Sequence, residues 1–226
     1  FCKGEHLTFR GRASGPLNRL HAHGTMHTDF GKADLNITLR NVIDPNRPLE
    51  IGGSASTERL DIGRIMEGIP VGECDMRTGL NATFAKDSLG IVIDSLYVDG
   101  LDVLGYKYSN IAAVGTFSQD AFDGRIVCSD PNLNFLFQGI FSLSSKTKNA
   151  LYQFYANLGY ADLHALNIDK RGVSKMSLST QANFTRISGE DIIGNISIKD
   201  VMLEDEHGRH DVGDIEIASH MGDELN

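Results

Sequence analysis

Tryptophan is absent from the chain, proline occurs only 5 times among 226 residues, and no apolar run approaches the roughly eighteen residues of a membrane-spanning helix. The sequence therefore predicts no transmembrane helix. The 24 glycines, set against so few prolines, are typical of many short strands and tight turns. No basic-then-apolar signal is found at the opening Phe1-Cys2-Lys3, so we interpret the chain as a segment of a longer protein, with any signal or membrane anchor outside it.

Cysteine is scarce as well. Cys2, Cys74 and Cys128 are too few and too far apart in the sequence for a disulfide framework or a zinc site. One bond between Cys74 and Cys128 remains open, but two buried or half-buried thiols fit the sequence better.

An excess of positive charge is also missing. The 21 Lys and Arg residues are outnumbered by 30 Asp and Glu residues, which gives a net charge of −9. The basic residues are scattered, with no cluster that could follow a phosphate backbone. These features exclude nucleic acid as the expected partner.

The motifs of common enzyme classes are missing too. The run at 52–56, Gly-Gly-Ser-Ala-Ser, is not a nucleophile elbow, and neither a P-loop nor a dinucleotide-binding motif occurs. Carboxylates lie largely at turns, where Asp bonds its own backbone. His21, His23 and His27 share one parity, but it is the parity expected to face solvent. We therefore expect no enzyme activity, no cofactor and no metal.

What dominates the chain is alternation of apolar and polar residues. Within 33–40, apolar side chains alternate with Asp, Asn, Thr and Arg, the pattern of a strand with one apolar and one wet face. Turns at 15–18 and 29–32 make this the last strand of a three-stranded meander. Uneven spacing over 60–66 predicts a short helical corner. Further strands are expected at 51–57, 72–85, 89–98, 108–117, 121–128, 132–143 and 150–160.

Two phrases recur about a hundred residues apart and in the same order. Residues 60–65 (LDIGRI) return as 161–166 (ADLHAL), and residues 91–98 (IVIDSLYV) return as 196–203 (ISIKDVML). We interpret residues 1–48 as the end of a preceding β-repeat, 49–155 as one repeat module and 156–226 as the start of the next.

Bulky side chains occupy the alternate positions that form the apolar face of each predicted strand, yet no helix is predicted to cover this face. We therefore expect an all-β protein: an elongated, curled antiparallel β-sheet with an apolar interior groove and little helix. An acyl chain suits such a groove, because burying each methylene gives about 0.8 kcal/mol and needs no polar partner. The residues predicted to line this lipid groove are Leu35, Ile37, Leu39, Leu133, Phe135, Phe137, Phe141, Tyr152, Phe154, Ile196 and Ile198.

Several phrases follow one another over about residues 10–205. They are Gly11-Arg12-Ala13-Ser14-Gly15-Pro16-Leu17-Asn18, Leu60-Asp61-Ile62-Gly63, Tyr106-Lys107-Tyr108-Ser109-Asn110-Ile111, Phe122-Asp123-Gly124-Arg125, Asp130-Pro131-Asn132-Leu133 and Ala161-Asp162-Leu163-His164-Ala165-Leu166. In this order they resemble TamB-like proteins (the translocation and assembly module TamB of the AsmA-like superfamily), particularly the large Bacteroidetes forms.

The resemblance implies a periplasmic protein tethered to the inner membrane by a segment outside this chain. Its taco-shaped β-sheet would carry phospholipid toward the outer membrane and serve outer-membrane biogenesis, with an Omp85-class partner reached through the full-length protein. Neither the anchor nor the C-terminal domain of the family is evident, so the chain resembles a middle segment.

Other functions stay open at this stage. The same strands could pack around a sealed core as a structural or adhesive domain, or form a chaperone-like scaffold for outer-membrane protein assembly. A carbohydrate-binding sandwich is a further alternative, although the lack of Trp and the modest number of Tyr residues disfavour it.

Overall fold

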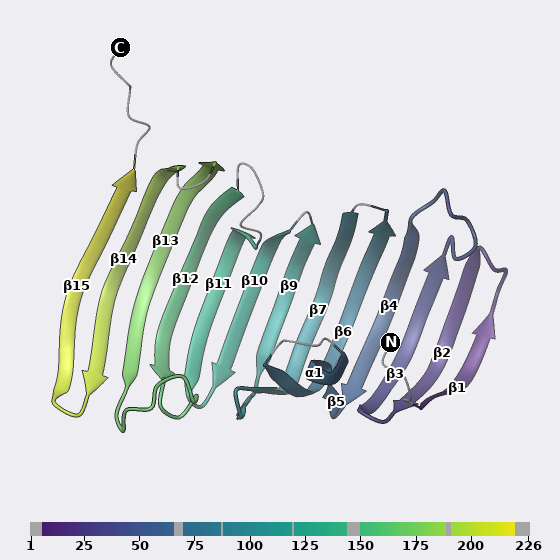
Figure 1. Ribbon diagram of the computed structural model, residues 1–226, viewed down its shortest axis with the longest axis horizontal. Coiled ribbons are helices and arrows are strands. Elements are labelled where there is room, and N and C mark those ends of the chain that lie inside the picture. The colour runs from purple at the N-terminus through teal and green to yellow at the C-terminus, as the bar shows by residue number, and fades with distance from the viewer. Residues whose placement is uncertain are drawn as a thin grey trace, which may run out of the picture. The chain divides into compact units, whose positions relative to one another are not determined.

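Alternating side chains form strands over most of the chain. The computed structural model describes residues 6–65, 70–86, 88–118, 120–143, 150–188 and 191–219, and these contain 15 strands and one four-residue helix. The expectation of an all-β, antiparallel, open sheet with little helix is confirmed (Figure 1). The chain divides into two compact units, residues 1–119 (unit 1) and 120–226 (unit 2).

Unit 1 opens with the predicted meander and continues with longer strands. Its path of hydrogen-bonded neighbours is β1-β2-β3-β4-β6-β7-β9, with β5 paired to β6 and β8 paired to β7, and all these pairs are antiparallel. The elements are β1 (Leu7–Ser14), β2 (Arg19–Thr28), β3 (Gly31–Arg40), β4 (Leu49–Glu58), β5 (Leu60–Asp61), α1 (Ile62–Ile65), β6 (Val71–Ala85), β7 (Ser88–Val103), β8 (Tyr106–Tyr108) and β9 (Ile111–Ser118).

Unit 2 is an antiparallel meander in which each strand pairs with the next along the chain. Its strands are β10 (Ala121–Asp130), β11 (Leu133–Ser142), β12 (Ala150–Asp162), β13 (Lys175–Ser188), β14 (Asp191–Asp205) and β15 (Gly208–Ser219). The predicted module boundaries after residues 48 and 155 do not coincide with the division into units. The second of them lies inside β12, and the module ranges stay a prediction.

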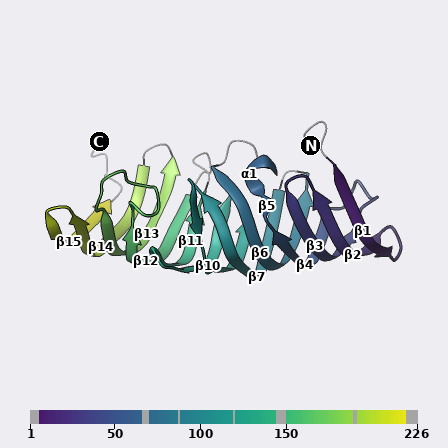
Figure 2. The same ribbon diagram turned by 90° about the horizontal axis from the view of Figure 1, so that it is seen from below.

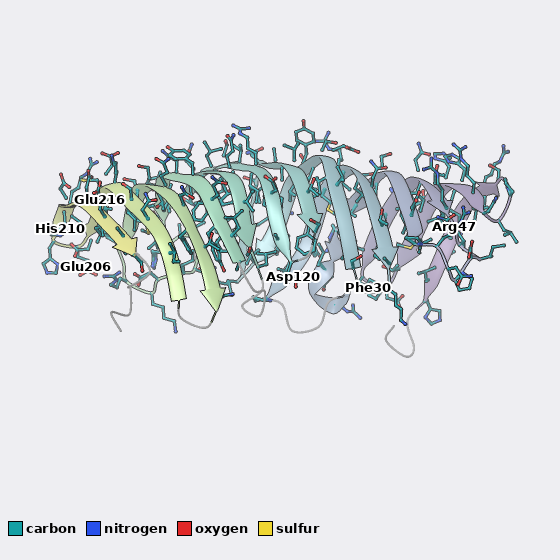
Figure 3. The ribbon with its side chains drawn as sticks, turned by 90° about the horizontal axis from the view of Figure 1, so that it is seen from above. Phe30, Arg47, Asp120, Glu206, His210 and Glu216 are labelled. Atoms are coloured by element: carbon teal, nitrogen blue, oxygen red, sulfur yellow. The ribbon has the colours of Figure 1, made fainter. Side chains whose placement is uncertain are left out.

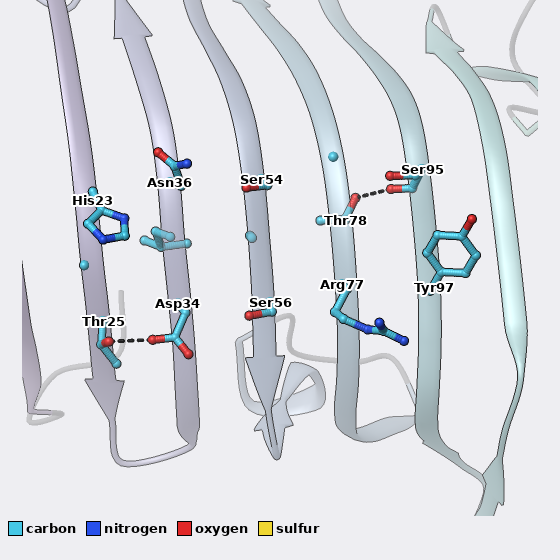
Figure 4. Close-up of a pocket in the computed structure, with 14 residues that line it drawn as sticks. His23, Thr25, Asp34, Asn36, Ser54, Ser56, Arg77, Thr78, Ser95 and Tyr97 are labelled. Atoms are coloured by element: carbon cyan, nitrogen blue, oxygen red, sulfur yellow. Dashed lines mark hydrogen bonds between the residues drawn. The ribbon is translucent and has the colours of Figure 1, made fainter.

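Cross-strand register gives each sheet one apolar and one polar face. In unit 1, Leu35 lies opposite Ala55 and Leu39 opposite Ile51, while Asp34 on the other face lies opposite Ser56. The strands of unit 1 bow toward the side on which α1 lies (Figures 2 and 3). Figure 4 looks onto the polar face with α1 behind the sheet, so the apolar face is the inner one.

The first recurring phrase forms the same corner in both units. Asp61 Oδ1 accepts a hydrogen bond from the Arg64 amide at 3.1 Å, and Asp162 Oδ1 accepts one from the Ala165 amide at 3.0 Å. An aspartate that accepts from an amide three residues on satisfies a donor that the first turn leaves unpaired. The short helical corner expected from the spacing is therefore present in unit 1 as α1.

Each corner is also bonded to an earlier hairpin. The Asp61 amide donates to the Phe30 carbonyl in the β2–β3 turn at 2.7 Å, and the Asp162 amide donates to the Asn132 carbonyl in the β10–β11 turn at 3.0 Å. In unit 1 the Arg64 guanidinium lies 5.4 Å from the centre of the Phe30 ring, which is labelled in Figure 3. The two phrases are thus similar in the hydrogen bonds that their residues make.

The second recurring phrase forms a strand with a β-bulge at the same place. In β7 the register shifts between Ile93 and Leu96, and in β14 it shifts between Ile198 and Val201. A bulge adds one residue to its strand, so the apolar side chains change parity and stay on one face. This explains why the apolar spacing in both phrases changes from two residues to three.

The two described cysteines are buried thiols, one in each unit. Cys74 is 2% exposed and Cys128 is 4% exposed, and no disulfide joins them. Cys2 lies outside the described residues. Burial raises the pKa of both thiols, because a thiolate is disfavoured away from water.

Removing the corner aspartate should lower the free energy of unfolding of each unit by about as much as the loss of a helix N-cap. We expect Asp162→Ala to lower the free energy of unfolding by about 1 kcal/mol, because the Ala165 amide loses its acceptor. Urea unfolding followed by circular dichroism measures this. Asp123→Ala, at an exposed position of β10, is the matched control and should change stability by less than about 0.5 kcal/mol. Equal values for the two variants would contradict the capping role.

The buried thiols should resist alkylation while the chain is folded. In a Cys2→Ser variant at neutral pH, Cys74 and Cys128 should react slowly with iodoacetamide, because their raised pKa leaves less thiolate. The rate should rise as the pH becomes alkaline and rise sharply in urea, as measured by intact mass. Rapid labelling of the folded chain at neutral pH would contradict this burial.

Candidate functional site

The residues predicted to line a lipid groove all lie on the apolar faces of the two units. In unit 1, Leu35, Ile37 and Leu39 share one face of β3 and are half-buried. The register of unit 2 places the other predicted residues on one face. They are Leu133, Phe135, Phe137 and Phe141 of β11, Tyr152 and Phe154 of β12, and Ile196 and Ile198 of β14.

Aromatic rings follow one another across the apolar face of unit 2, and we call this set the aromatic ladder. Its members are Phe122 on β10, Phe137 and Phe141 on β11, Tyr152 and Phe154 on β12, and Phe184 on β13. Phe137 lies 5.3 Å from Phe154, and Tyr152 stacks on Phe184 at 4.5 Å between ring centroids. Aromatic pairs at such distances stabilise by about 0.5–1.5 kcal/mol beyond the area they bury.

Two members of the aromatic ladder were not among the predicted groove residues. Phe122 is the second residue of β10, which was predicted as a strand. Its even position, shared with Ile126 and Cys128, indicated that it lies on the apolar face. Phe184 lies on β13, for which no strand was predicted. The even-numbered apolar residues of that strand, from Met176 to Phe184, carry a period-two signal that could have found it.

Glycines lie directly opposite two rings of the aromatic ladder. Gly139 has φ +133° and faces Phe154, and Gly194 has φ +137° and faces Phe184. A Cβ on Gly139 would lie 2.6 Å from the Phe154 Cα, and one on Gly194 would lie 2.5 Å from the Phe184 Cα. Only glycine fits at these two positions, because a side chain would collide with the backbone of the neighbouring strand.

The apolar faces are half-open. The exposed fraction is 9% for Phe137 but 36% for Phe141. Among the described residues, Leu166 is the only large side chain with less than 2% of its surface exposed. The described strands of each unit form a single sheet, and none of them packs over these faces as a second layer (Figure 2).

The corner of unit 2 continues into a loop that is tied down by an ionic cluster. Leu166 is buried in this loop, at 1% exposure. Asp169 accepts hydrogen bonds from Arg171 and from the Ser174 hydroxyl, the latter at 2.7 Å. These donors hold the pKa of Asp169 well below its usual range. The loop can therefore keep a fixed position beside the strand ends.

The polar face of unit 1 carries a shallow hollow of about 620 Å³ across β2, β3, β4, β6 and β7 (Figure 4). Small residues form its floor, namely Ser54, Ser56, Gly79 and Ser95. Larger polar residues form two walls, with His23, Thr25, Asp34 and Asn36 on one side and Arg77 and Tyr97 on the other. No residue of this hollow other than Leu35 was singled out as a groove residue from the sequence.

The described residues offer little for metal or membrane chemistry. No group of three or more His, Cys, Asp or Glu side chains within them is placed to hold a metal ion. His21, His23 and His27 are exposed on the polar face, on the parity expected. None of the helices in the described ranges has the length and apolar character needed to cross a membrane.

Comparison of the chain with family models, curated proteins and solved structures finds no match. The resemblance to TamB-like proteins therefore stays a prediction, as does all that it implies.

The aromatic ladder should contribute to stability in proportion to its burial. We expect Phe137→Ala to lower the free energy of unfolding of unit 2 by about 3 kcal/mol, because it removes a buried ring between Phe122 and Phe154. Phe141→Ala should cost about 1–2 kcal/mol, since that ring is partly exposed already. Urea titrations compare the two, and a larger loss for Phe141→Ala would contradict this ranking.

Proposed function

We propose that the apolar faces hold phospholipid acyl chains, so that this chain is a non-catalytic section of a lipid conduit. The observation that carries the proposal is the half-open apolar face. Bulky residues occupy one face of each sheet, and no second layer of strands lies over them in the part of the chain that the structure describes. A soluble domain rarely leaves a large contiguous apolar surface without an occupant.

The chemistry of the face suits an acyl chain. A saturated chain needs no hydrogen-bond partner, and each methylene that leaves water contributes about 0.8 kcal/mol. In unit 2 the aromatic ladder offers a continuous row of rings, with centroids 4.5 to 6.0 Å apart, against which methylenes can pack. The six rings of this row are uncharged.

Within this proposal the chain is a periplasmic section of a TamB-like protein, tethered to the inner membrane by a segment outside it. It would guide phospholipid between the inner and outer membranes. Any Omp85-class partner would be engaged by the full-length protein rather than by the faces described above. The proposal is supported by the apolar and polar faces and by the repeated corner and bulge.

A second candidate is a scaffold for nascent outer-membrane proteins. It is compatible with β1, in which every residue is exposed, and with β15, in which nearly every residue is exposed. An edge strand offers backbone donors and acceptors to a guest strand, whereas an acyl chain uses none. The two candidates therefore differ in whether the guest binds the edge or the apolar face.

A charge on the apolar face should block lipid binding. We expect the purified chain to carry phospholipid in native mass spectrometry, and Phe141→Asp to reduce the bound fraction at least tenfold, because an acyl chain would have to desolvate a carboxylate. Phe141 is preferred over the more buried Phe137, since its 36% exposure lets the variant fold.

The matched control is Tyr155→Asp, on the polar face of β12 and 41% exposed. It should bind lipid as the wild type does. Circular dichroism and urea unfolding verify that both variants fold. If Phe141→Asp retains lipid, or if the wild type binds neither phospholipid nor a fluorescent fatty acid, the conduit is wrong. If a β-strand peptide binds to the edge strands, and Phe141→Asp leaves that binding unchanged, the scaffold is favoured.

A further inference from the structure

The polar hollow of unit 1 lies on the face opposite the apolar groove, so the lipid proposal leaves it without a role. It crosses five neighbouring strands, β2, β3, β4, β6 and β7 (Figure 4). With about 4.8 Å between neighbouring strands, four spacings extend roughly 19 Å. The hollow is therefore long, shallow and perpendicular to the strands, a shape that fits an extended, flat ligand rather than a compact one.

The first wall presents a fixed carboxylate. Asp34 Oδ1 accepts a hydrogen bond from the Thr25 hydroxyl at 2.5 Å, and Asp34 Oδ2 lies 3.3 Å from Lys32 Nζ. The hydrogen bond from Thr25 is the main cause that lowers the pKa of Asp34, so the group is ionised at neutral pH. It keeps lone pairs for a further donor, because a carboxylate accepts about four hydrogen bonds.

The second wall presents an exposed aromatic ring. Tyr97 is 54% exposed, and the Arg77 guanidinium lies 6.0 Å from its ring centroid. Arg77 is in turn paired with Asp99, with 3.1 Å between Nη2 and Oδ1. The pairing fixes Arg77 beside the ring and offsets its positive charge. An exposed tyrosine held in this way is a platform for an apolar ligand face, with a hydroxyl for hydrogen bonding.

The floor supplies groups that both donate and accept. Ser54 and Ser56 place hydroxyls on β4, and Asn36 adds an amide on β3 beside them. Hydroxyls and amides match a ligand that is rich in hydroxyl groups. Asp34 is paired with Lys32, and Arg77 is paired with Asp99, so neither wall presents an uncompensated charge to a ligand. The combination selects a neutral polyhydroxylated ligand.

From these observations we infer that the polar hollow binds a neutral oligosaccharide, lying across β2 to β7. One sugar ring packs on Tyr97, and hydroxyls of the other sugars bond to Asp34, Asn36 and the serines of the floor. The side chains proposed to contact the sugar come from the face of the sheet opposite the lipid groove, and of the lining residues only Leu35 is also a predicted groove residue.

Tyrosine fluorescence offers a direct readout, since the chain has no tryptophan and 6 tyrosines. The probes are three neutral hexasaccharides, cellohexaose, maltohexaose and hexa-N-acetylchitohexaose, each also measured by calorimetry. We expect one of them to bind with a Kd of about 0.1–1 mM, the range of an open and shallow site. Tyr97→Ala and Asp34→Asn should each weaken binding at least tenfold.

A third variant, Ser54→Ile, tests the shape of the hollow. A β-branched residue is well tolerated at an exposed strand position, so the variant should fold, but its side chain fills the floor and should abolish binding. Tyr155→Ala, which removes an exposed tyrosine from the polar face of unit 2, and Phe141→Asp, on the apolar face, are the matched controls and should bind as the wild type does.

The oligosaccharide site is overturned if none of the three sugars binds at millimolar concentration. It is also overturned if binding survives all three hollow variants, or if only a sulfated oligosaccharide binds. Loss of lipid binding in Phe141→Asp with unchanged sugar binding separates this site from the lipid groove, so either proposal can fail alone.

Discussion

The antiparallel register between neighbouring strands is the constraint on which this structure depends. A strand alone has two faces, but only pairing decides which residue of the next strand shares a face with it. In both units the register aligns apolar parity with apolar parity, as where Phe137 lies opposite Ile126 on one side and Ala156 on the other. A slip of one residue in one strand would move the rings of that strand to the polar face.

The bulges protect this alignment over long strands. Strands β7 and β14 are 16 and 15 residues long, and each has a register shift within it. A bulge in each strand resets the alternation, and the apolar residues on both sides of it remain on one face. The corners act on the neighbouring strands, where an aspartate and a hairpin carbonyl fix the chain before it re-enters the sheet. The two units repeat both devices.

The two faces differ in chemistry because one carries apolar side chains that pack together, while the other carries polar side chains that face water. The apolar face has too few buried side chains for a sealed core, so its stability rests on ring packing within one layer and on whatever covers it. The polar face is covered by water, and its salt bridges contribute little individually. A row of small residues between larger polar ones leaves a hollow there. A single sheet can therefore present an apolar face of the kind that suits lipid and a polar face of the kind that suits sugars, on its two opposite sides.

The sequence by itself determined most of the strands up to β12, the turns between them, the helical corner and the solvent-facing parity of His21, because local alternation and turn chemistry act within a few residues. It also indicated the two repeated phrases. It did not identify β13 as a strand. Only the tertiary structure decided that Phe122 and Phe184 complete the aromatic ladder, since cross-strand pairing joins residues far apart in the chain. The polar hollow was equally beyond the sequence. His23 and Tyr97 become its opposite walls through four successive strand pairings, and no local pattern encodes that distance.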